Sequence, residues 1–201
     1  MRGKRFAILD RDGTIIEKHH YLLDPAHVAL LPGAGEALYR MQHTLGLGLV
    51  IITNQSPVGR GLLSIDTLSR IHERLKQLLG GFRVTIDGVF FCPHAPEAGC
   101  NCRKPRTGLV EVAARELHFD PAQGFLIGDS LSDMELGIAV SSTTFLVRTG
   151  SGRDVERAGG GMARYIVDDL SQAAERIECI LPAMLENNQG RPDLRMGKGG
   201  K

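Results

Sequence analysis

Aspartates stand at the ends of two apolar runs in this sequence, where carboxylates can gather around a cation. Asp10 and Asp12 follow the run Phe6 to Leu9, and Asp129 follows the run Phe125 to Ile127 after one glycine. Residues two apart in an extended backbone point the same way, so the first two carboxylates can face one site. Ligands of open α/β sheets bind beyond the carboxyl ends of strands, where the third can join them. Three crowded carboxylates repel each other unless a hard cation such as Mg²⁺ binds them, so a magnesium site is expected here.

This carboxylate cluster predicts a phosphoryl-transfer reaction. At its usual pKa an aspartate is ionised at pH 7, so Asp10 can act as a nucleophile without a base, and Mg²⁺ offsets its repulsion from phosphate. A neighbouring carboxylate favours the protonated form of Asp12, which can protonate the leaving oxygen and then activate the water that hydrolyses the aspartyl-phosphate. The alternative is two solvated aspartates in a turn. A calcium loop does not fit, because Ile15 and Tyr21 replace its required glycine and glutamate.

Polar and cationic residues near other element boundaries can hold the phosphate. Thr53, Asn54 and Gln55 follow a second apolar run and offer a hydroxyl group and two amides. Arg103 and Lys104 carry positive charges that can neutralise the negative charge spread over a phosphoryl group during its transfer. Asp133 lies four residues after Asp129 and can orient that aspartate without binding the metal itself. Each residue alone could be structural, but their occurrence in this order predicts a phosphatase.

Four residues with soft or borderline ligand atoms lie within eleven positions: Cys92, His94, Cys100 and Cys102. This set suits a tetrahedral Zn²⁺ site, and with all four positions filled no water can be activated, so the zinc is expected to be structural. The loop continues directly into the two cations described above, which zinc would hold at the phosphate. The alternative is a group of free thiols beside a surface histidine.

Short apolar runs alternate with helical patterns, which predicts an α/β fold with a Rossmann-like parallel sheet flanked by helices. Strands are expected at residues 6–9, 47–53, 89–91, 125–127 and 144–147, and helices at 32–44, 64–79, 109–117 and 173–181. No second helical block interrupts these units, so any cap is minimal. We expect one domain over residues 1–181 and a disordered, glycine-rich tail over 182–201.

Composition restricts the partners that this chain is expected to have. Its 201 residues are 42 % hydrophobic and carry a net charge of +1, so no basic field attracts nucleic acid. The apolar runs are too short to span a bilayer, and the N-terminal run ends too early for an export signal. We expect a cytoplasmic monomer that binds a small phosphorylated sugar and neither nucleic acid nor a membrane.

The motifs resemble those of the haloacid dehalogenase superfamily of phosphatases over residues 5 to about 150. The four matching passages are Asp10-Arg11-Asp12-Gly13-Thr14, Thr53, Lys104 and Gly128-Asp129 with Asp133. The resemblance implies that the side chains of Asp10 and Asp129 and the backbone carbonyl of Asp12 hold Mg²⁺. It also implies that Lys104 contacts the phosphoryl group.

Within this superfamily the chain resembles the D-glycero-D-manno-heptose 1,7-bisphosphate 7-phosphatases of bacterial surface-polysaccharide synthesis. The resemblance extends to Thr53-Asn54-Gln55-Ser56 with Arg60-Gly61, and to Cys92-Pro93-His94 with Cys102-Arg103-Lys104-Pro105. It implies that Arg60 and Arg103 face the sugar or its second phosphate. This sequence departs from those relatives at Ser130, where they usually carry a basic residue, and at Pro57, where glycine is common.

Other functions are compatible with parts of the pattern. Histidinol-phosphate phosphatases share the Asp10-Arg11-Asp12-Gly13-Thr14 passage and the Cys92-Pro93-His94 passage with Cys102-Arg103-Lys104-Pro105. They usually differ after Thr-Asn-Gln and are often fused to a dehydratase domain. Another sugar-phosphate phosphatase is a further alternative. The cysteine-histidine loop also fits a zinc nucleic-acid-binding module or a polynucleotide-end phosphatase, which the near-neutral charge and the scarcity of aromatic residues disfavour. A phospho-sugar sensor without turnover is disfavoured because no catalytic position is missing.

Overall fold

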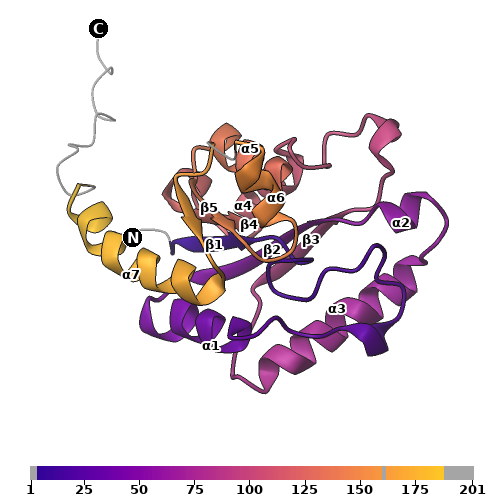
Figure 1. The fold of residues 1–201 in the computed structure, drawn as a ribbon, viewed down its shortest axis with the longest axis horizontal. Coiled ribbons are helices and arrows are strands. Elements are labelled where there is room, and N and C mark those ends of the chain that lie inside the picture. The colour runs from indigo at the N-terminus through magenta and orange to yellow at the C-terminus, as the bar shows by residue number, and fades with distance from the viewer. Residues whose placement is uncertain (1–3, 160–161, 188–201) are drawn as a thin grey trace, which may run out of the picture.

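Six strands form one sheet in the order β3-β2-β1-β4-β5-β6, and all neighbouring pairs are parallel (Figure 1). The computed structural model describes residues 4–159 and 162–187 of the chain. The strands are β1 Phe6–Leu9, β2 Gly48–Asn54, β3 Gly88–Cys92, β4 Phe125–Gly128, β5 Thr143–Val147 and β6 Tyr165–Val167. The order reverses direction beside β1, which makes the β1–β4 boundary the switch point where open α/β sheets bind ligands.

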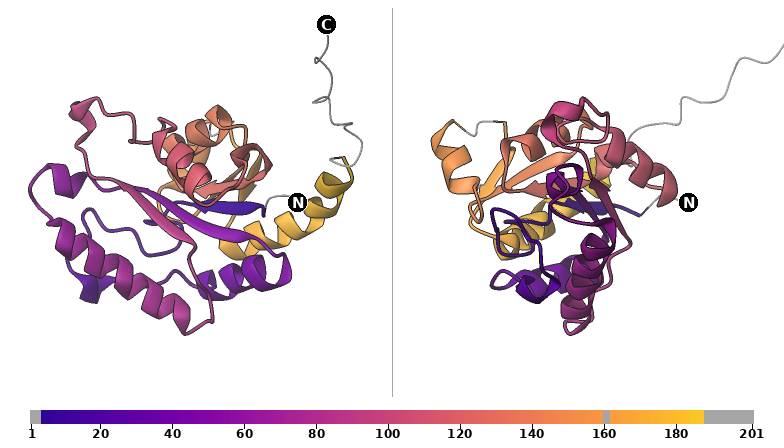
Figure 2. Two further views of the ribbon diagram at one scale, coloured as in Figure 1. Left: turned by 180° about the vertical axis from the view of Figure 1, so that it is seen from behind. Right: turned by 90° about the vertical axis from the view of Figure 1, so that its right-hand side faces the viewer.

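Helices cover both faces of the sheet (Figures 1 and 2). One layer contains α1 Ala34–Tyr39 with its π-helical continuation Arg40–Thr44, α3 Ile65–Gly80 and α7 Leu170–Asn187. The other layer contains α4 Gly108–Glu116, α5 Leu131–Ala139 and α6 Gly152–Arg157. The short α2 Ser56–Gly59 follows β2, and single 3-10 turns lie at Pro25–His27, Pro96–Ala98 and Pro121–Gln123.

The sheet separates two hydrophobic cores. Alternate side chains of a strand point to opposite faces. Ala7 and Leu9 therefore pack into the core beneath α1, α3 and α7, whereas Phe6 and Ile8 pack into the core beneath α4 and α5. All four are buried. Burial on both faces explains why the strands read as continuous apolar runs rather than as alternating ones.

Helix α3 shows how local sequence sets an element that supports the site. The Ser64 hydroxyl accepts a hydrogen bond from the Thr67 N–H at 3.0 Å and caps the helix. Its inward face is apolar and buried, at Leu68, Ile71, Leu75 and Leu79. Burial of such a face, more than helix propensity, stabilises a helix of this length.

The predicted strands and helices are present with ends shifted by a few residues, and the α/β architecture is confirmed. The short elements α2, α5, α6 and β6 were not predicted. Helix α7 continues through Pro182 to Asn187, beyond the predicted end of the domain at residue 181, and residues 188–201 lie outside the described part. Between β1 and α1 the chain forms loops, isolated bridges and one 3-10 turn, in agreement with a minimal cap. No helix of the described residues is long and apolar enough to cross a membrane.

Parallel pairing brings the polar strand ends to one edge of the sheet. Leu9 pairs with Ile51 of β2 and with Ile127 of β4, so the residues that follow these strands emerge side by side. The Asp10 N–H donates to the Ile127 carbonyl at 3.0 Å and extends this ladder by one residue. In Figure 1 the long indigo loop after β1 and helix α2 lie at this same edge.

Candidate active site

A pocket opens at this edge and is lined by four segments of the chain. They are residues 10–12 with 18–22 after β1, residues 53–57 at the end of β2, Lys104 after the cysteine-histidine loop, and residues 129, 130 and 132 after β4. The predicted residues Asp10, Asp12, Thr53, Lys104, Asn54 and Asp129 all lie in this lining. Segments more than 100 residues apart in the sequence therefore form one site.

Three buried carboxylates meet at the base of the pocket. Oxygens of Asp10, Asp129 and Asp133 lie within 4.8 Å of one another. The Oδ1 atom of Asp129 is buried and has no hydrogen-bond partner among the described residues. A buried carboxylate oxygen without a partner is costly, and a cation would satisfy it. The sequence placed Asp133 only in support, but its side chain belongs to this group.

Lys104 neutralises part of this acidic cluster. Its Nζ donates to Asp10 Oδ1 and Asp133 Oδ1 at 2.7 Å each, and to the Ile52 carbonyl at 2.8 Å. Burial alone would lower the pKa of Lys104, but the carboxylates of Asp10 and Asp133 outweigh it and raise that pKa. The lysine therefore stays charged and holds the first aspartate in place.

Burial changes the chemistry expected of Asp10. Desolvation, opposed by Lys104 and assisted by Asp133 and Asp129, raises the pKa of Asp10 to about 7. The sequence-based expectation of a freely ionised Asp10 did not include this desolvation. A cation at the cluster would restore the ionised form, because an adjacent positive charge favours a carboxylate.

Asp12 is oriented by Arg11, which the sequence did not single out, and by Gln55, which was expected to contact phosphate. Arg11 donates from Nε to Asp12 Oδ2 and from Nη2 to Oδ1, both at 3.0 Å, and only 1 % of its surface is exposed. The Gln55 amide also donates to Asp12 Oδ2 at 3.0 Å. A bidentate guanidinium contact fixes a carboxylate in one plane. The side chain of Asp12 consequently faces the pocket beside Asp10 but stands apart from the three-carboxylate group.

Asp129 is enclosed by backbone and by a second lysine. Its Oδ2 accepts hydrogen bonds from Lys18 Nζ and from the Ser151 N–H, both at 2.7 Å. A Cβ atom at Gly13 or Gly150 would lie 2.4 or 2.1 Å from this oxygen. Only glycine allows the two loops to approach so closely, which leaves Oδ1 directed to the cluster. Burial, opposed by the hydrogen bond from Lys18, raises the pKa of Asp129.

Thr53 and Asn54 reach the pocket by different contacts. The buried Thr53 hydroxyl accepts a hydrogen bond from the Gln55 amide at 3.0 Å. The Asn54 side chain accepts from the Lys104 N–H at 3.0 Å and donates to the Lys104 carbonyl at 3.2 Å. Asn54 thus fixes the backbone that carries the buried lysine.

The two predicted arginines do not line this pocket. Arg60 lies 3.4 Å from Glu97 in an exposed ion pair. Arg103 donates to the His94 carbonyl at 3.4 Å and borders a separate hollow beside the cysteine-histidine loop. Their predicted contact with a substrate remains a prediction, and in this conformation neither guanidinium group reaches the carboxylates.

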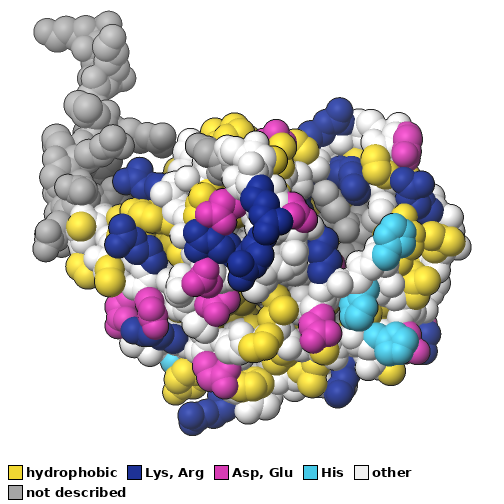
Figure 3. Space-filling view, in the orientation of Figure 1, with side chains coloured by type: hydrophobic (Ala, Val, Ile, Leu, Met, Phe, Trp, Pro, Cys, Tyr) yellow, Lys and Arg dark blue, Asp and Glu magenta, His cyan; other side chains and the backbone are white. Residues whose placement is uncertain are grey.

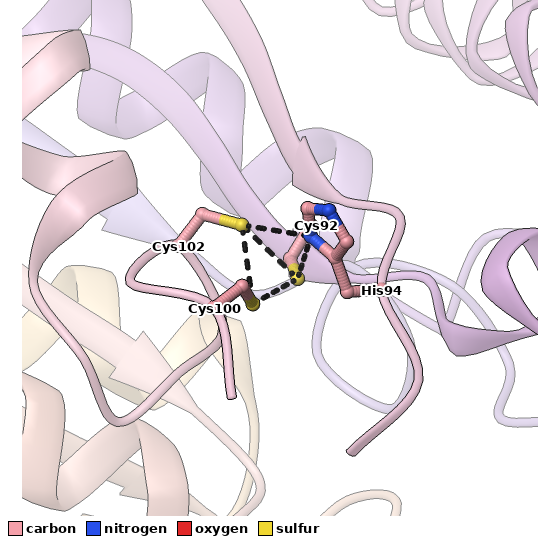
Figure 4. Close-up of side chains that lie close together, drawn as sticks. All are labelled: Cys92, His94, Cys100 and Cys102. Atoms are coloured by element: carbon pink, nitrogen blue, oxygen red, sulfur yellow. Dashed lines mark hydrogen bonds between the residues drawn. The ribbon is translucent and has the colours of Figure 1, made fainter. Parts of the chain in front are cut away.

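The predicted zinc ligands converge in space (Figure 4). The ligand atoms are His94 Nδ1 and the sulfur atoms of Cys92, Cys100 and Cys102. The sulfur–sulfur and sulfur–nitrogen distances between contacting pairs range from 3.2 to 3.6 Å. These distances are too long for disulfides, and they approach the edges of a tetrahedron with metal bonds of about 2.0–2.3 Å. Despite desolvation, hydrogen bonds with Cys102 and Cys92 lower the pKa of Cys100 to about 6, which favours a thiolate ligand.

The donor sets of the two clusters differ in the metal they fit. The oxygen cluster of Asp10, Asp129 and Asp133 suits a hard cation such as Mg²⁺, and its orphaned oxygen is an open ligand position. The Cys₃His set suits Zn²⁺ and uses four ligands of the protein. Each group of residues therefore fits the metal that the sequence predicted for it.

Two residues of the site were missed from the sequence, Arg11 and Lys18, and Gln55 was expected to contact phosphate rather than Asp12. Arg11 lies between the two predicted catalytic aspartates, so its position within a motif was an available signal. Lys18 lies in an irregular loop, where neither periodicity nor spacing predicts the direction of a side chain.

Comparison with known proteins gives consistent relatives. A family model described as HAD-hydrolase-like matches residues 101–173. A D-glycero-beta-D-manno-heptose-1,7-bisphosphate 7-phosphatase of Bordetella bronchiseptica is 34 % identical over 175 residues, which are 86 % of this chain and 97 % of the relative. The enzyme of the same name from Escherichia coli K12 is 31 % identical over 178 residues, which are 85 % and 92 % of the two chains.

Solved structures agree with these sequence relatives. A crystal structure of D,D-heptose 1,7-bisphosphate phosphatase from B. bronchiseptica, complexed with magnesium and phosphate, superposes with a TM-score of 0.81 at 34 % identity. It covers 87 % of this chain and 98 % of its own. The corresponding enzyme from Burkholderia thailandensis gives a TM-score of 0.68 at 32 % identity, with the same coverage. Given this similarity over nearly whole chains and the acidic cluster described above, the chain belongs to the haloacid dehalogenase-like phosphatases.

Proposed function

We propose that this protein is a Mg²⁺-dependent phosphatase that acts through an aspartyl-phosphate on Asp10. The observation that carries the proposal is the position of Asp10, which is held by Lys104 and faces the pocket beside Asp129 and Asp133. Mg²⁺ would be held by Asp10, Asp129 and the backbone carbonyl of Asp12. The Asp133 carboxylate lies next to the first two of these ligands. The metal would neutralise negative charge on the nucleophile and on the phosphate.

The residues of the chain divide the reaction into two steps. In the first step an oxygen of Asp10 forms a bond to phosphorus, the bond between phosphorus and the sugar oxygen breaks, and Asp12 gives its proton to that oxygen. In the second step Asp12 takes a proton from water, whose oxygen attacks phosphorus and releases Asp10 with inorganic phosphate. Arg11 and Gln55 hold the Asp12 carboxylate beside the pocket in the conformation described. Asp12 must exchange one of the Arg11 contacts for a proton before it can act as the acid.

We further propose that the substrate is D-glycero-D-manno-heptose 1,7-bisphosphate and that the 7-phosphate is removed. The names of the sequence relatives and of the similar solved structures support this assignment. Histidinol phosphate and other sugar phosphates remain the competing substrates. In Figure 3, lysine and arginine side chains are interspersed with aspartate and glutamate over the visible face, which does not favour a polynucleotide substrate.

The Cys92, His94, Cys100 and Cys102 cluster is proposed to bind one structural Zn²⁺. Four protein ligands leave no position for a reactive water, so this metal would act by shaping the loop. The loop ends two residues before Lys104, whose buried ammonium group contacts Asp10. Zinc would therefore act on catalysis through the position of this lysine.

Phosphate release from a panel of phosphorylated sugars and histidinol phosphate, with and without Mg²⁺, tests the proposal. We expect the heptose bisphosphate to give the highest kcat/KM and Asp10→Asn to abolish turnover. Asp66→Asn is the matched control, because Asp66 forms an exposed ion pair with Arg70 on α3. Full activity of Asp10→Asn would overturn the mechanism, and a higher kcat/KM for histidinol phosphate would overturn the substrate assignment.

A further inference from the structure

Lysine and arginine side chains of the described residues enter the pocket lining at three positions: Arg11, Lys18 and Lys104. A phosphate group entering this pocket meets Asp10, Asp12 and Asp129, so it needs cationic partners on the protein as well as on a metal. The three cations differ in how many of their N–H groups are already used and in how far solvent reaches them.

Lys104 and Arg11 are committed to carboxylates of the protein. The ammonium group of Lys104 has three donors, and all three are used by Asp10, Asp133 and the Ile52 carbonyl. Its side chain is 4 % exposed. The Arg11 side chain is 1 % exposed and holds Asp12 through Nε and Nη2, while its Nη1 is buried and has no partner among the described residues. In this conformation neither residue offers an exposed donor to a substrate, and the predicted contact of Lys104 with the phosphoryl group remains a prediction.

Lys18 has the properties that these two cations lack. Its Nζ donates to Asp129 Oδ2 at 2.7 Å and to the Ser151 hydroxyl at 2.8 Å, which leaves one of three N–H donors without a partner among the described residues. The side chain is 39 % exposed and lines the pocket. The two existing contacts anchor the ammonium group beside Asp129 while its third donor remains available.

We propose that Lys18 is a phosphate-binding residue, which donates its remaining N–H to a non-bridging oxygen of the phosphate that enters the pocket. This inference rests on the proposed phosphatase function, and it assigns the phosphate contact to a residue outside the four signature passages. Ser130, directly after Asp129, lines the same pocket and carries no charge, so Lys18 supplies the positive charge at this side of the pocket.

The Asp129 contact allows a second role, which the experiment must separate from the first. A carboxylate that holds a metal is often oriented by a hydrogen-bond partner behind it, and loss of that partner weakens metal binding. If Lys18 served only to orient Asp129, its removal would change the affinity for Mg²⁺ and leave phosphate binding at saturating Mg²⁺ unchanged. If Lys18 binds phosphate, its removal weakens phosphate binding even at saturating Mg²⁺.

Calorimetric titration of the full chain with inorganic phosphate at saturating Mg²⁺ tests the proposal without turnover. We expect Lys18→Met to weaken phosphate binding about tenfold, as for the loss of one charge-assisted hydrogen bond, and Lys18→Arg to restore part of the affinity. Lys76→Met is the matched control, because Lys76 forms an ion pair with Glu73 on the surface of α3 at 2.8 Å. Lys18→Gln provides a second variant if the methionine variant folds poorly.

The outcomes separate this inference from the proposed function. Weaker phosphate binding by Lys18→Met and Lys18→Gln, with Lys76→Met at the wild-type value, supports the assignment. Unchanged phosphate affinity in both Lys18 variants overturns it, and so does a change confined to the Mg²⁺ titration. Failure of the wild-type protein to hydrolyse any phosphorylated sugar would overturn the proposed function, while phosphate binding would still measure the contribution of Lys18.

Discussion

Individual charges in this site are stabilised by neighbouring groups, because water reaches few of them. Lys104 is 5 % exposed and Arg11 is 1 % exposed, yet each contacts carboxylate oxygens at 2.7 to 3.0 Å. Replacing such a pair by apolar residues can preserve stability, whereas removing one partner leaves a buried charge uncompensated. Burying these charged pairs costs free energy, and in return the pairs fix the orientation of Asp10 and Asp12.

His72 gives a prediction at this scale, because its imidazole is buried on α3 near the Arg11 guanidinium. Burial, assisted by Arg11, lowers the pKa of His72 to about 4 from 6.5. The unfolded chain binds a proton below pH 6.5 while the folded chain does not, so this contribution to stability is complete above pH 6.5 and is lost as pH falls toward 4. At pH 5 the loss is about 2 kcal/mol.

Urea unfolding at pH 7 and pH 5 measures this effect. We expect the wild type to lose about 2 kcal/mol more than His72→Leu between the two pH values. His27→Gln serves as the control because His27 is exposed, and it should follow the wild type. An equal pH dependence for His72→Leu and wild type would show that this histidine is not kept neutral by the fold.

At the scale of elements, short loops rather than the long helices place the reactive groups. The loop from Cys92 to Cys102 contains only one 3-10 turn, and its four ligand atoms lie on the inside of a tight fold (Figure 4). The Asn54 side chain at the end of β2 forms hydrogen bonds with both the backbone N–H and the carbonyl of Lys104. A metal held by the Cys₃His cluster and the hydrogen bonds of Asn54 would therefore both fix the backbone that carries Lys104.

Loss of a zinc ligand should thus affect catalysis at a distance. We expect Cys100→Ser to lose bound zinc and to lower kcat, because a displacement of about 1 Å at a catalytic group can cost about 100-fold in rate. Zinc content by mass spectrometry and phosphate release at saturating Mg²⁺ provide the measurements. Cys179→Ser is the control, since Cys179 is exposed on α7 and outside the cluster. Wild-type kcat in a zinc-free Cys100→Ser protein would contradict the link to Lys104.

At the scale of the whole molecule, close approach between the loops after β1 and β5 completes the site. Gly13 and Gly150 both contact Asp129 from loops more than 130 residues apart, and the Thr149 hydroxyl donates to the Gly13 carbonyl at 2.6 Å. Gly13 has φ +85°, and its added Cβ would meet the Asp129 carboxylate at 2.4 Å. The parallel sheet brings the loops together, and the glycines determine how closely they approach.

Gly13→Ala and Gly46→Ala separate backbone strain from this close approach. Gly46 also has positive φ, at +69°, but an added Cβ would meet nothing within 4 Å. Left-handed backbone strain should cost each variant about 1–2 kcal/mol of stability. Gly13→Ala should lose more, because its Cβ would overlap the Asp129 carboxylate, and only this variant should displace Asp129 and reduce phosphate release. Equal phosphate release per folded protein in the two variants would refute the proposed contribution of this contact.

The sequence by itself determined the α/β class, most strands and helices, and the residues at which β1, β2 and β4 meet the pocket. These features follow from hydrophobic periodicity and from motifs read along the chain. Fully buried strands need continuous apolar runs, and carboxylates follow two of them at β1 and β4. The four predicted zinc ligands could also be identified from the sequence, because their spacing within one loop limits how they can be arranged.

Only the tertiary structure decided which charged groups face one another. Lys18 contacts Asp129 across 111 positions and Arg11 contacts Asp12. Arg60 and Arg103 instead contact Glu97 and the His94 carbonyl and do not line the pocket. Helix α5 and strand β6 were also missed, and α7 continues past Pro182. The physical reason is that loop side chains follow no period, so their directions depend on packing between segments distant in the sequence.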